Sequence, residues 1–369
     1  MIDNLEKSLD KKILYIGGFE LPDKNAAAQR VVGIAKALRE LEYNVCFLNS
    51  IKNSTIITPE KKEYFGFECY EYRREKEKDY LFSAKTVLAK IYQIKPNIII
   101  AYNYPAYALE KIRKYCLHQN IRCYVDSTEW YQAFGNNLVY RIIKNIDTKH
   151  RMVNVQKKMD GIIAISRYLY EYYKDETNTV IIPPIVDLND EKWNIASAKN
   201  KKFTSFVYAG SPSIQKEKLD VIIEAIERVP SKYSVLLNVV GVTEKQFKEM
   251  YSWEKPISER VKFWGRVEHR KAIEIIKQSN WSVILRENNQ VVKAGFPTKL
   301  VESISCGTPV IVNEFSNIKD YLDDTNSIMI PDLSKIDFAI EKALNSSVIV
   351  DNALFDYHRY LEPLKLLLS

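Results

Sequence analysis

The amino-acid sequence predicts an α/β protein built from two doubly wound, Rossmann-like domains that face each other across a cleft. Short runs of aliphatic and β-branched residues alternate with stretches of helical periodicity along most of the chain. A length of 369 residues is too great for one compact core and suits two domains. A Pro-Pro pair followed by a polar stretch without periodicity, residues 183–202, interrupts this alternation, which then begins again.

The first domain is predicted to span residues 1–186 and to contain a parallel sheet. Its expected strands are nearly continuous apolar runs, which is typical of strands that are buried on both faces. Helical stretches separate the strands, as parallel connections require. The expected strands are 12–16, 44–48, 97–101, 122–125 and 161–165, and the expected helices are 26–41, 80–94, 105–119, 138–159 and 167–174.

The second domain is predicted over residues 187–349, with the same alternation. Its helix at 298–306 closes at a glycine, which is the usual residue after a helix C-terminus. After this domain, residues 352–368 carry apolar positions at helical spacing. The expected strands are 203–208, 234–240, 260–263, 281–285 and 309–312, and the expected helices are 215–229, 268–278 and 298–306.

The composition excludes several classes of protein. Hydrophobic residues make up 46% and charged residues 27% of the chain, which excludes a disordered or collagen-like protein. No apolar segment is long enough to cross a membrane, and the charged first residues do not form a secretion signal. Five isolated cysteines without metal-ligand spacing indicate a reducing compartment. We therefore expect a cytoplasmic protein.

The net charge of +7 lies entirely in the first half of the chain. Residues 1–186 contain 29 Lys and Arg against 22 Asp and Glu, whereas residues 187–369 contain 25 of each. A basic surface of this kind attracts phosphate on nucleic acid, anionic lipid or a lipid-linked substrate. An ordinary solvated, lysine-rich surface is the alternative. No zinc finger, basic recognition helix or RNA-binding aromatic motif supports nucleic acid.

In each domain, a glycine-containing loop follows the first strand. Gly17 and Gly18 would let a phosphate or sugar approach the backbone closely, although their spacing is not the dinucleotide fingerprint G-x-G-x-x-G. A tight turn without a ligand explains them as well. In the second domain, Gly210 is followed by Lys216 and Lys218 near the start of a helix. Cations are unfavourable there unless an anion also binds, and a solvated lysine pair is the alternative.

Two further strand ends carry charged residues. Arg286 follows the strand 281–285, where a guanidinium suits bidentate contact with phosphate, unless it only forms a surface ion pair with Glu287. The segment 294–311 contains a Gly- and Pro-containing loop and then a helix with Lys299 and Glu302. Glu302 is placed to accept hydrogen bonds from a ribose diol, unless it is a surface residue favoured by the helix dipole.

These motifs resemble those of the retaining GT-B glycosyltransferases, in particular glycosyltransferase family 4. The run GFPTKLVESISCGTPVI is similar to the signature helix of that family. The run VIIPPIVD resembles the segment by which the family enters its donor domain, and YAGSPSIQKEKLDVIIEAI resembles the first loop and helix of that domain. The resemblance covers most of the chain in the expected order. It implies the GT-B fold, with residues 350–369 crossing back to the N-terminal domain.

The resemblance also implies roles for individual residues. Lys216, Arg286 and Glu302 would be catalytic, the two cations by neutralising the diphosphate and the carboxylate by holding the ribose. Asp126, Glu129 and Trp130 would lie on the acceptor side. No metal or other cofactor is implied, since no Asp-x-Asp pair lies at a strand end. The donor-binding residues would be Gly17, Gly18, Gly210, Ser211, Lys218, Lys293, Gly295, Phe296, Pro297, Thr298 and Lys299.

The sequence departs from the family pattern at three places. Ala294 stands where the family has the first glutamate of its Glu-x7-Glu pair, and Ser211 stands where it has an arginine. No histidine follows a middle strand of the first domain, where Asp126 and Glu129 are found instead. The four histidines, His118, His150, His269 and His358, are interpreted as surface or packing residues.

The sequence therefore predicts a metal-independent, retaining transferase. It would move a sugar from a nucleoside-diphosphate sugar to a saccharide or lipid-linked saccharide in bacterial surface polysaccharide synthesis. Residues 138–159 mix basic and apolar positions and could lie on the inner face of an anionic membrane, or else simply cover the sheet. A catalytically silent partner subunit, which Ala294 favours, and a GT-B sugar epimerase are the alternatives.

Overall fold

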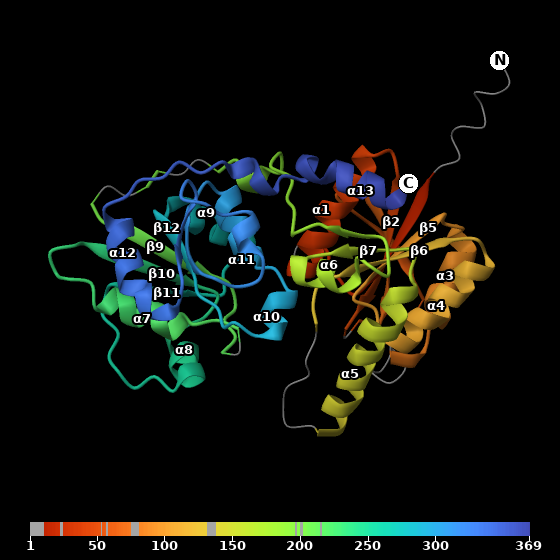
Figure 1. The fold of residues 1–369 in the computed structure, drawn as a ribbon, viewed down its shortest axis with the longest axis horizontal. Coiled ribbons are helices and arrows are strands. Elements are labelled where there is room, and N and C mark those ends of the chain that lie inside the picture. The colour runs from red at the N-terminus through yellow and green to blue at the C-terminus, as the bar shows by residue number, and fades with distance from the viewer. Residues whose placement is uncertain are drawn as a thin grey trace, which may run out of the picture. The chain divides into compact units, whose positions relative to one another are not determined.

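Figure 1 shows the computed structural model, which describes residues 11–22, 25–52, 54–56, 58–74, 81–130, 138–195, 198–199, 202–214 and 216–369. The chain forms two compact units. Unit 1 is Met1–Ile185 together with Tyr357–Ser369, and unit 2 is Val186–Asp356. Each unit has a largely parallel sheet covered by helices, so the predicted fold class is confirmed. The charged N-terminal residues 1–10 lie outside the described residues.

The sheet of unit 1 has the strand order β3-β4-β2-β1-β5-β6-β7-β8. The pairings are parallel except for that between β3 and β4. Strand β1 lies between β2 and β5, so the strand order reverses at its carboxyl end. The strands are β1 (Lys12–Gly17), β2 (Asn44–Ile51), β3 (Glu60–Tyr64), β4 (Phe67–Arg73), β5 (Ile98–Tyr102), β6 (Arg122–Ser127), β7 (Gly161–Ala164) and β8 (Thr179–Ile181).

Helices cover both faces of this sheet. Helix α1 begins after Asn25, whose side chain accepts a hydrogen bond from the Ala28 N–H and so caps the helix. Helices α1 and α13 share one apolar core, and α3 and α4 pack into the core on the other face. The helices of unit 1 are α1 (Ala26–Glu40), α3 (Lys85–Ile94), α4 (Ala106–His118), α5 (Leu138–His150), α6 (Arg167–Tyr173) and α13 (Leu361–Leu368).

The predicted helix at 138–159 is shorter than expected. Helix α5 ends at His150 and is followed by a wider π-type turn, Arg151–Val155, and a short 3₁₀ turn, Gln156–Lys158. Met152 and Val155 are fully buried, so this second part covers the sheet. In the part of the chain that the structure describes, no helix has the length and apolarity needed to cross a bilayer.

The end of the chain also differs from the prediction of one helix. Two 3₁₀ turns, Asn352–Phe355 and Tyr357–Tyr360, precede α13. Residues up to Asp356 belong to unit 2, because the Val186 N–H donates to the Phe355 carbonyl at 2.9 Å and the Leu188 N–H donates to Asp356 Oδ2 at 3.1 Å. Only Tyr357–Ser369 returns to unit 1, and not the whole of 350–369.

The sheet of unit 2 has the order β11-β10-β9-β12-β13-β14, with parallel pairing throughout. Strand β9 lies between β10 and β12, which again places a reversal of strand order at the carboxyl end of the first strand. The strands are β9 (Thr204–Ala209), β10 (Val235–Val240), β11 (Val261–Gly265), β12 (Trp281–Ile284), β13 (Val310–Asn313) and β14 (Ser327–Ile330). The helices are α7 (Leu219–Glu227), α8 (Glu244–Tyr251), α9 (His269–Gln278), α10 (Gln290–Ala294), α11 (Thr298–Ser305) and α12 (Ile336–Leu344).

Candidate functional site

The carboxyl end of β9 is shaped by two glycines. Gly210 follows β9 with a φ of +131°, and Gly241 follows β10 with a φ of +104°. A Cβ at Gly210 would lie 2.3 Å from Cε of Lys299, and a Cβ at Gly241 would lie 2.4 Å from the Gly210 carbonyl oxygen. The lack of side chains here lets Lys299, from α11, cross the end of β9 in contact with the backbone.

Lys299 is the centre of a buried polar cluster. Its ammonium group donates to both carboxylate oxygens of Glu217 and, at 2.9 Å, to the Tyr208 hydroxyl. The Tyr208 hydroxyl in turn donates to Glu217. All three side chains are buried, with Lys299 8% exposed and Glu217 4%. Since a buried charge is costly unless it is paired and hydrogen-bonded, each group depends on the others.

Burial and charge act in opposite directions on this cluster. Burial lowers the pKa of Lys299 to about 8, although Glu217 raises it in part. Burial by itself would raise the pKa of Glu217, but Lys299 and Arg286 outweigh burial and hold that pKa below its ordinary value. Burial, and then the Glu217 charge, raise the pKa of Tyr208 well above its ordinary value. An ammonium group that loses its proton near pH 8 is therefore held at a strand end.

Arg286 completes the cluster from the end of β12. Its guanidinium donates to Glu217 Oε1 at 3.0 Å, and its backbone exchanges hydrogen bonds with the Asn313 side chain at 2.8 and 2.9 Å. Within the described part of the chain, the buried Nε of Arg286 has no hydrogen-bond partner. Glu217 and Arg286 also form an isolated antiparallel bridge, which fixes the loop before α7 against β12. One donor of this guanidinium is thus buried without a partner among the described residues.

The two lysines that flank Glu217 lie outside the buried cluster. Lys218 forms an ion pair with Glu287, and both side chains are partly exposed. Lys216 is half-buried, and its carbonyl accepts the Glu287 N–H at 3.0 Å. The expected alternative of an Arg286–Glu287 pair is wrong, because Arg286 pairs with Glu217 and Glu287 pairs with Lys218.

Glu302 lies one turn after Lys299 on α11 and contacts a histidine. Its Oε1 is 3.0 Å from Nε2 of His269, the first residue of α9, and both side chains are partly exposed. The sequence interpretation of His269 as a surface or packing residue did not include this contact with Glu302. The two groups form a polar pair whose carboxylate still reaches solvent.

The loop before α11 is partly structural. Phe296 is 6% exposed and packs edge-on against Tyr321 and Phe355, so its ring belongs to the core of unit 2 and is not free to face a donor. Ala294 is fully buried, and the Gly295 carbonyl accepts a hydrogen bond from the Ser316 hydroxyl at 2.8 Å. Of the remaining predicted positions in unit 2, Ser211 and Lys293 are exposed, Gly295 and Thr298 are half-buried, and Pro297 is buried.

In unit 1, the predicted acceptor-side residue Asp126 is enclosed. It is fully buried and accepts hydrogen bonds from Arg30 at 2.6 to 3.0 Å and from the Tyr15 hydroxyl at 2.5 Å. Its carboxylate is therefore satisfied inside the protein and holds Arg30 between the sheet and α1. Glu129 and Trp130 are half-buried, and the Trp130 ring packs edge-on against Tyr172 at 4.9 Å.

The predicted glycine loop of unit 1 lies beside an arginine. A Cβ on Gly18 would lie 1.9 Å from a guanidinium nitrogen of Arg74, which follows β4, and a Cβ on Gly17 would lie 2.5 Å from the Phe19 ring. The Gly17 carbonyl accepts the Ser50 hydroxyl at 3.1 Å. The glycines thus serve close packing as well as any ligand.

Sequence reasoning missed Glu217, Tyr208, Asn313 and Arg74. Glu217 stands between two lysines in the printed sequence, which was the available signal that a carboxylate accompanies the cations. Among the described residues, no group of three or more His, Cys, Asp or Glu side chains is arranged to hold a metal ion.

Residues 189–348 match the family model described as Glycosyl transferases group 1, which covers the strand ends of unit 2 described above. A search of curated protein sequences found no match.

Solved structures of similar fold cover nearly the whole chain. Sucrose-phosphate synthase from Thermosynechococcus elongatus has a TM-score of 0.70 at 14% identity, with coverage of 97% of this chain and 98% of that one. The lipopolysaccharide outer core galactosyltransferase WaaB has a TM-score of 0.66 at 13% identity, with coverage of 97% and 99%. HepE of Anabaena, solved with UDP and glucose, has a TM-score of 0.63 at 14% identity, also with 97% and 99%. The fold is that of the GT-B glycosyltransferases.

Proposed function

We propose that this protein is a retaining glycosyltransferase that moves a sugar from a nucleoside-diphosphate sugar to a hydroxyl of a saccharide or lipid-linked saccharide. The observation that carries the proposal is the cluster of Lys299, Arg286 and Glu217, one helical turn from Glu302, inside the residues that match the glycosyl transferase model. Nucleotide-sugar ligands in similar structures, such as UDP-glucose in HepE, support the same class of donor.

The cations would stabilise the leaving diphosphate. Departure of a diphosphate from the sugar carbon develops negative charge on a phosphate oxygen, and preorganised donors at that oxygen lower the barrier. Lys299 and Arg286 together carry one more positive charge than Glu217 neutralises. These two groups form the core of the proposed diphosphate site, and Lys216 and Lys218 remain proposed outer contacts.

Glu302 would hold the ribose of the nucleotide. Its carboxylate is partly exposed and touches the protein through the His269 imidazole at 3.0 Å, which leaves lone pairs for a diol. His269 orients the carboxylate and is a positioning residue in this proposal. The reaction needs no metal here, because side-chain cations supply the charge.

We propose that the acceptor is a saccharide of bacterial surface polysaccharide synthesis. The basic excess of the first half of the chain supports an anionic or lipid-linked acceptor, since such a surface attracts phosphate. A catalytically silent partner subunit is the second candidate. The fully buried Ala294 stands where the family that the sequence resembles has a carboxylate, and its absence favours a subunit without transfer activity.

A donor screen tests the proposal. The purified chain is incubated with UDP-, GDP- and other nucleotide sugars and a lipid-linked saccharide extract, with EDTA present, and nucleotide release and product are measured. We expect release with one donor, a loss of at least about 100-fold in Glu302→Ala, and a product of unchanged anomeric configuration by NMR. Release that requires added metal, or a product of inverted configuration, would refute the mechanism. Binding without release in any mixture would favour the silent subunit.

A further inference from the structure

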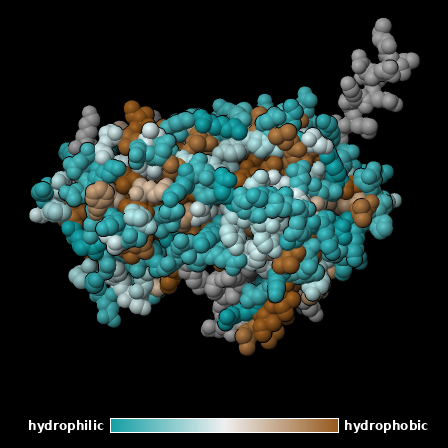
Figure 2. Space-filling view, in the orientation of Figure 1, coloured by the Kyte–Doolittle hydropathy of each residue, from teal (hydrophilic) through white to brown (hydrophobic). Residues whose placement is uncertain are grey.

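Helix α5 of unit 1 presents a stripe of apolar side chains to solvent. The five residues repeat at spacings of three, four, seven and eight, so they lie on one side of the helix. Figure 2 shows a hydrophobic patch over α5 at the lower edge of the view. A soluble surface exposes isolated apolar side chains routinely, but a contiguous patch marks an interaction site. The stripe consists of Leu138, Val139, Ile142, Ile143 and Ile146, which are 42% to 66% exposed.

The charges around this stripe are positive. Arg141 and Lys149 are exposed on α5, and Lys144 is half-buried. The single acidic residue of the helix, Asp147, is buried and accepts the Ala106 N–H at 2.9 Å. Burial raises its pKa above the ordinary value. The outer face of α5 therefore combines aliphatic side chains with cations and carries no carboxylate of its own.

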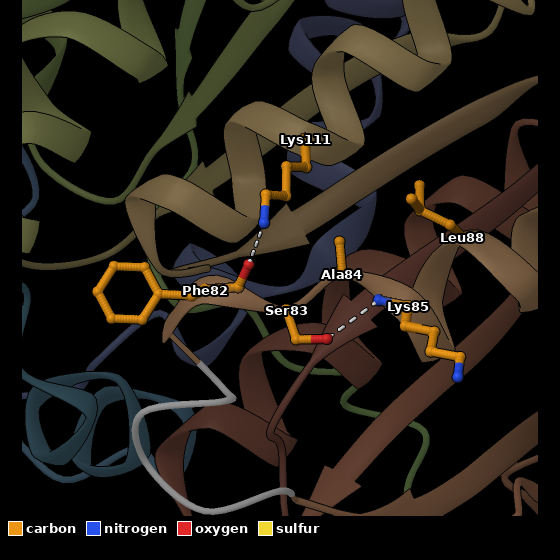
Figure 3. A pocket seen from close by; sticks show the side chains of 6 residues that line it. All are labelled: Phe82, Ser83, Ala84, Lys85, Leu88 and Lys111. Carbon is orange, nitrogen blue, oxygen red and sulfur yellow. Dashed lines mark hydrogen bonds between the residues drawn. The ribbon is translucent and has the colours of Figure 1, made fainter.

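Two exposed aromatic rings adjoin the helix. Phe82 and Tyr107 are 44% and 41% exposed, with ring centroids 5.1 Å apart, and Tyr107 lies 5.1 Å from the ring of His150 at the end of α5. Beside Phe82 is an open hollow of about 510 Å³ with Lys85 and Lys111 at its rim (Figure 3). Lys111 donates to the Phe82 carbonyl at 2.7 Å, which holds that loop against α4.

We propose that unit 1 docks on an anionic lipid bilayer through this α5 surface, defined as the five-residue stripe together with Phe82 and Tyr107. An amphipathic helix with a basic flank buries its apolar face in the headgroup region of such a membrane, and aromatic rings are favoured at the same depth. A second copy of the chain fits less well, because a two-fold pairing of this face would bring the cations of both copies together. The inference is independent of the transfer reaction.

Vesicle co-sedimentation of the full chain tests the inference. The protein is mixed, without nucleotide sugar, with one of two kinds of vesicle. One kind is phosphatidylcholine alone and the other also contains about 30% phosphatidylglycerol, both at about physiological ionic strength. We expect binding to the anionic vesicles and a loss of at least about tenfold in partitioning for the double variant Ile142→Ser, Ile146→Ser, because each side chain no longer buries apolar surface. The matched control is Leu117→Ser on α4, a residue 69% exposed elsewhere in unit 1, which should bind like wild type.

A charge variant separates this proposal from general stickiness. Arg141→Gln with Lys149→Gln should weaken binding about fivefold per cation on anionic vesicles. Equal binding to both vesicle types, or binding unchanged in the isoleucine variant, would overturn the proposal. Concentration-dependent dimerisation that the isoleucine variant abolishes would also overturn it and assign the face to a second copy. Because no donor is present, failure here would leave the proposed transfer reaction standing.

Discussion

The substitution Glu217→Ala should strongly destabilise unit 2. It leaves the buried ammonium of Lys299 and the guanidinium of Arg286 without their shared carboxylate. Removing one partner of a buried ion pair costs about 3–5 kcal/mol. Lys299 can escape by losing its proton, which from its pKa of about 8 in the folded protein costs about 1.4 kcal/mol at pH 7. The two routes bracket the effect, so we expect a loss of about 1.5–5 kcal/mol in the free energy of unfolding.

Urea unfolding followed by tryptophan fluorescence measures this loss. Four of the five tryptophans lie in unit 2, so the signal reports on the affected unit. Adding Lys299→Met to Glu217→Ala should recover at least half of the loss, because the buried cation is then removed. Glu249→Ala, which breaks an exposed pair with Lys245, is the control and should change the free energy by less than about 0.5 kcal/mol. A loss below about 1 kcal/mol for Glu217→Ala would refute the reasoning.

Three further predictions concern stability. Asp126→Asn should lower the free energy of unfolding by about 3 kcal/mol in chemical denaturation, because Arg30 loses its buried carboxylate, and a loss under about 1 kcal/mol would contradict this. Gly210→Ala should lower the melting temperature by several degrees, because its added Cβ would meet Lys299. The control is Gly307→Ala, whose added Cβ would meet nothing within 4 Å and which should lower the melting temperature by less. Equal losses in the two variants would argue against close contact with Lys299. Between pH 8 and about pH 10, the free energy of unfolding of wild type should rise by about 2 kcal/mol relative to that of Lys299→Met, because the unfolded lysine keeps a proton that the folded one with a pKa of about 8 has lost; parallel pH profiles would contradict this.

Much of the fold could be predicted because buried parallel strands leave a strong signal in sequence. Strands such as β1 and β5 have an apolar centre of aliphatic and aromatic residues, and the structure has them within one or two residues of the prediction. The hairpin β3–β4 was missed because the segment EKKEY is an exposed edge strand without an apolar face. The end of the chain was predicted as one helix because its apolar spacing does not reveal that Asp356 is anchored to Leu188.

The location of the candidate site could be predicted from the sequence, but the hydrogen-bond and ion-pair partners of its residues could not. Arg286, Lys299 and Glu302 could be found because each follows a recognisable strand end or helix start. Their partners depend on tertiary contacts, since Glu217 reaches Arg286 across 69 residues and His269 reaches Glu302 across 33. No local pattern encodes those separations.

Calorimetric titration of the chain with UDP and GDP tests the central claim most directly, which is that Lys299 and Arg286 bind the diphosphate. We predict binding of one nucleotide to wild type and a loss of at least about tenfold in affinity for Lys299→Met, which removes a charge-assisted contact. Lys245→Met, at a lysine that is 86% exposed on α8, should bind like wild type. Equal affinity in wild type and Lys299→Met would contradict the claim.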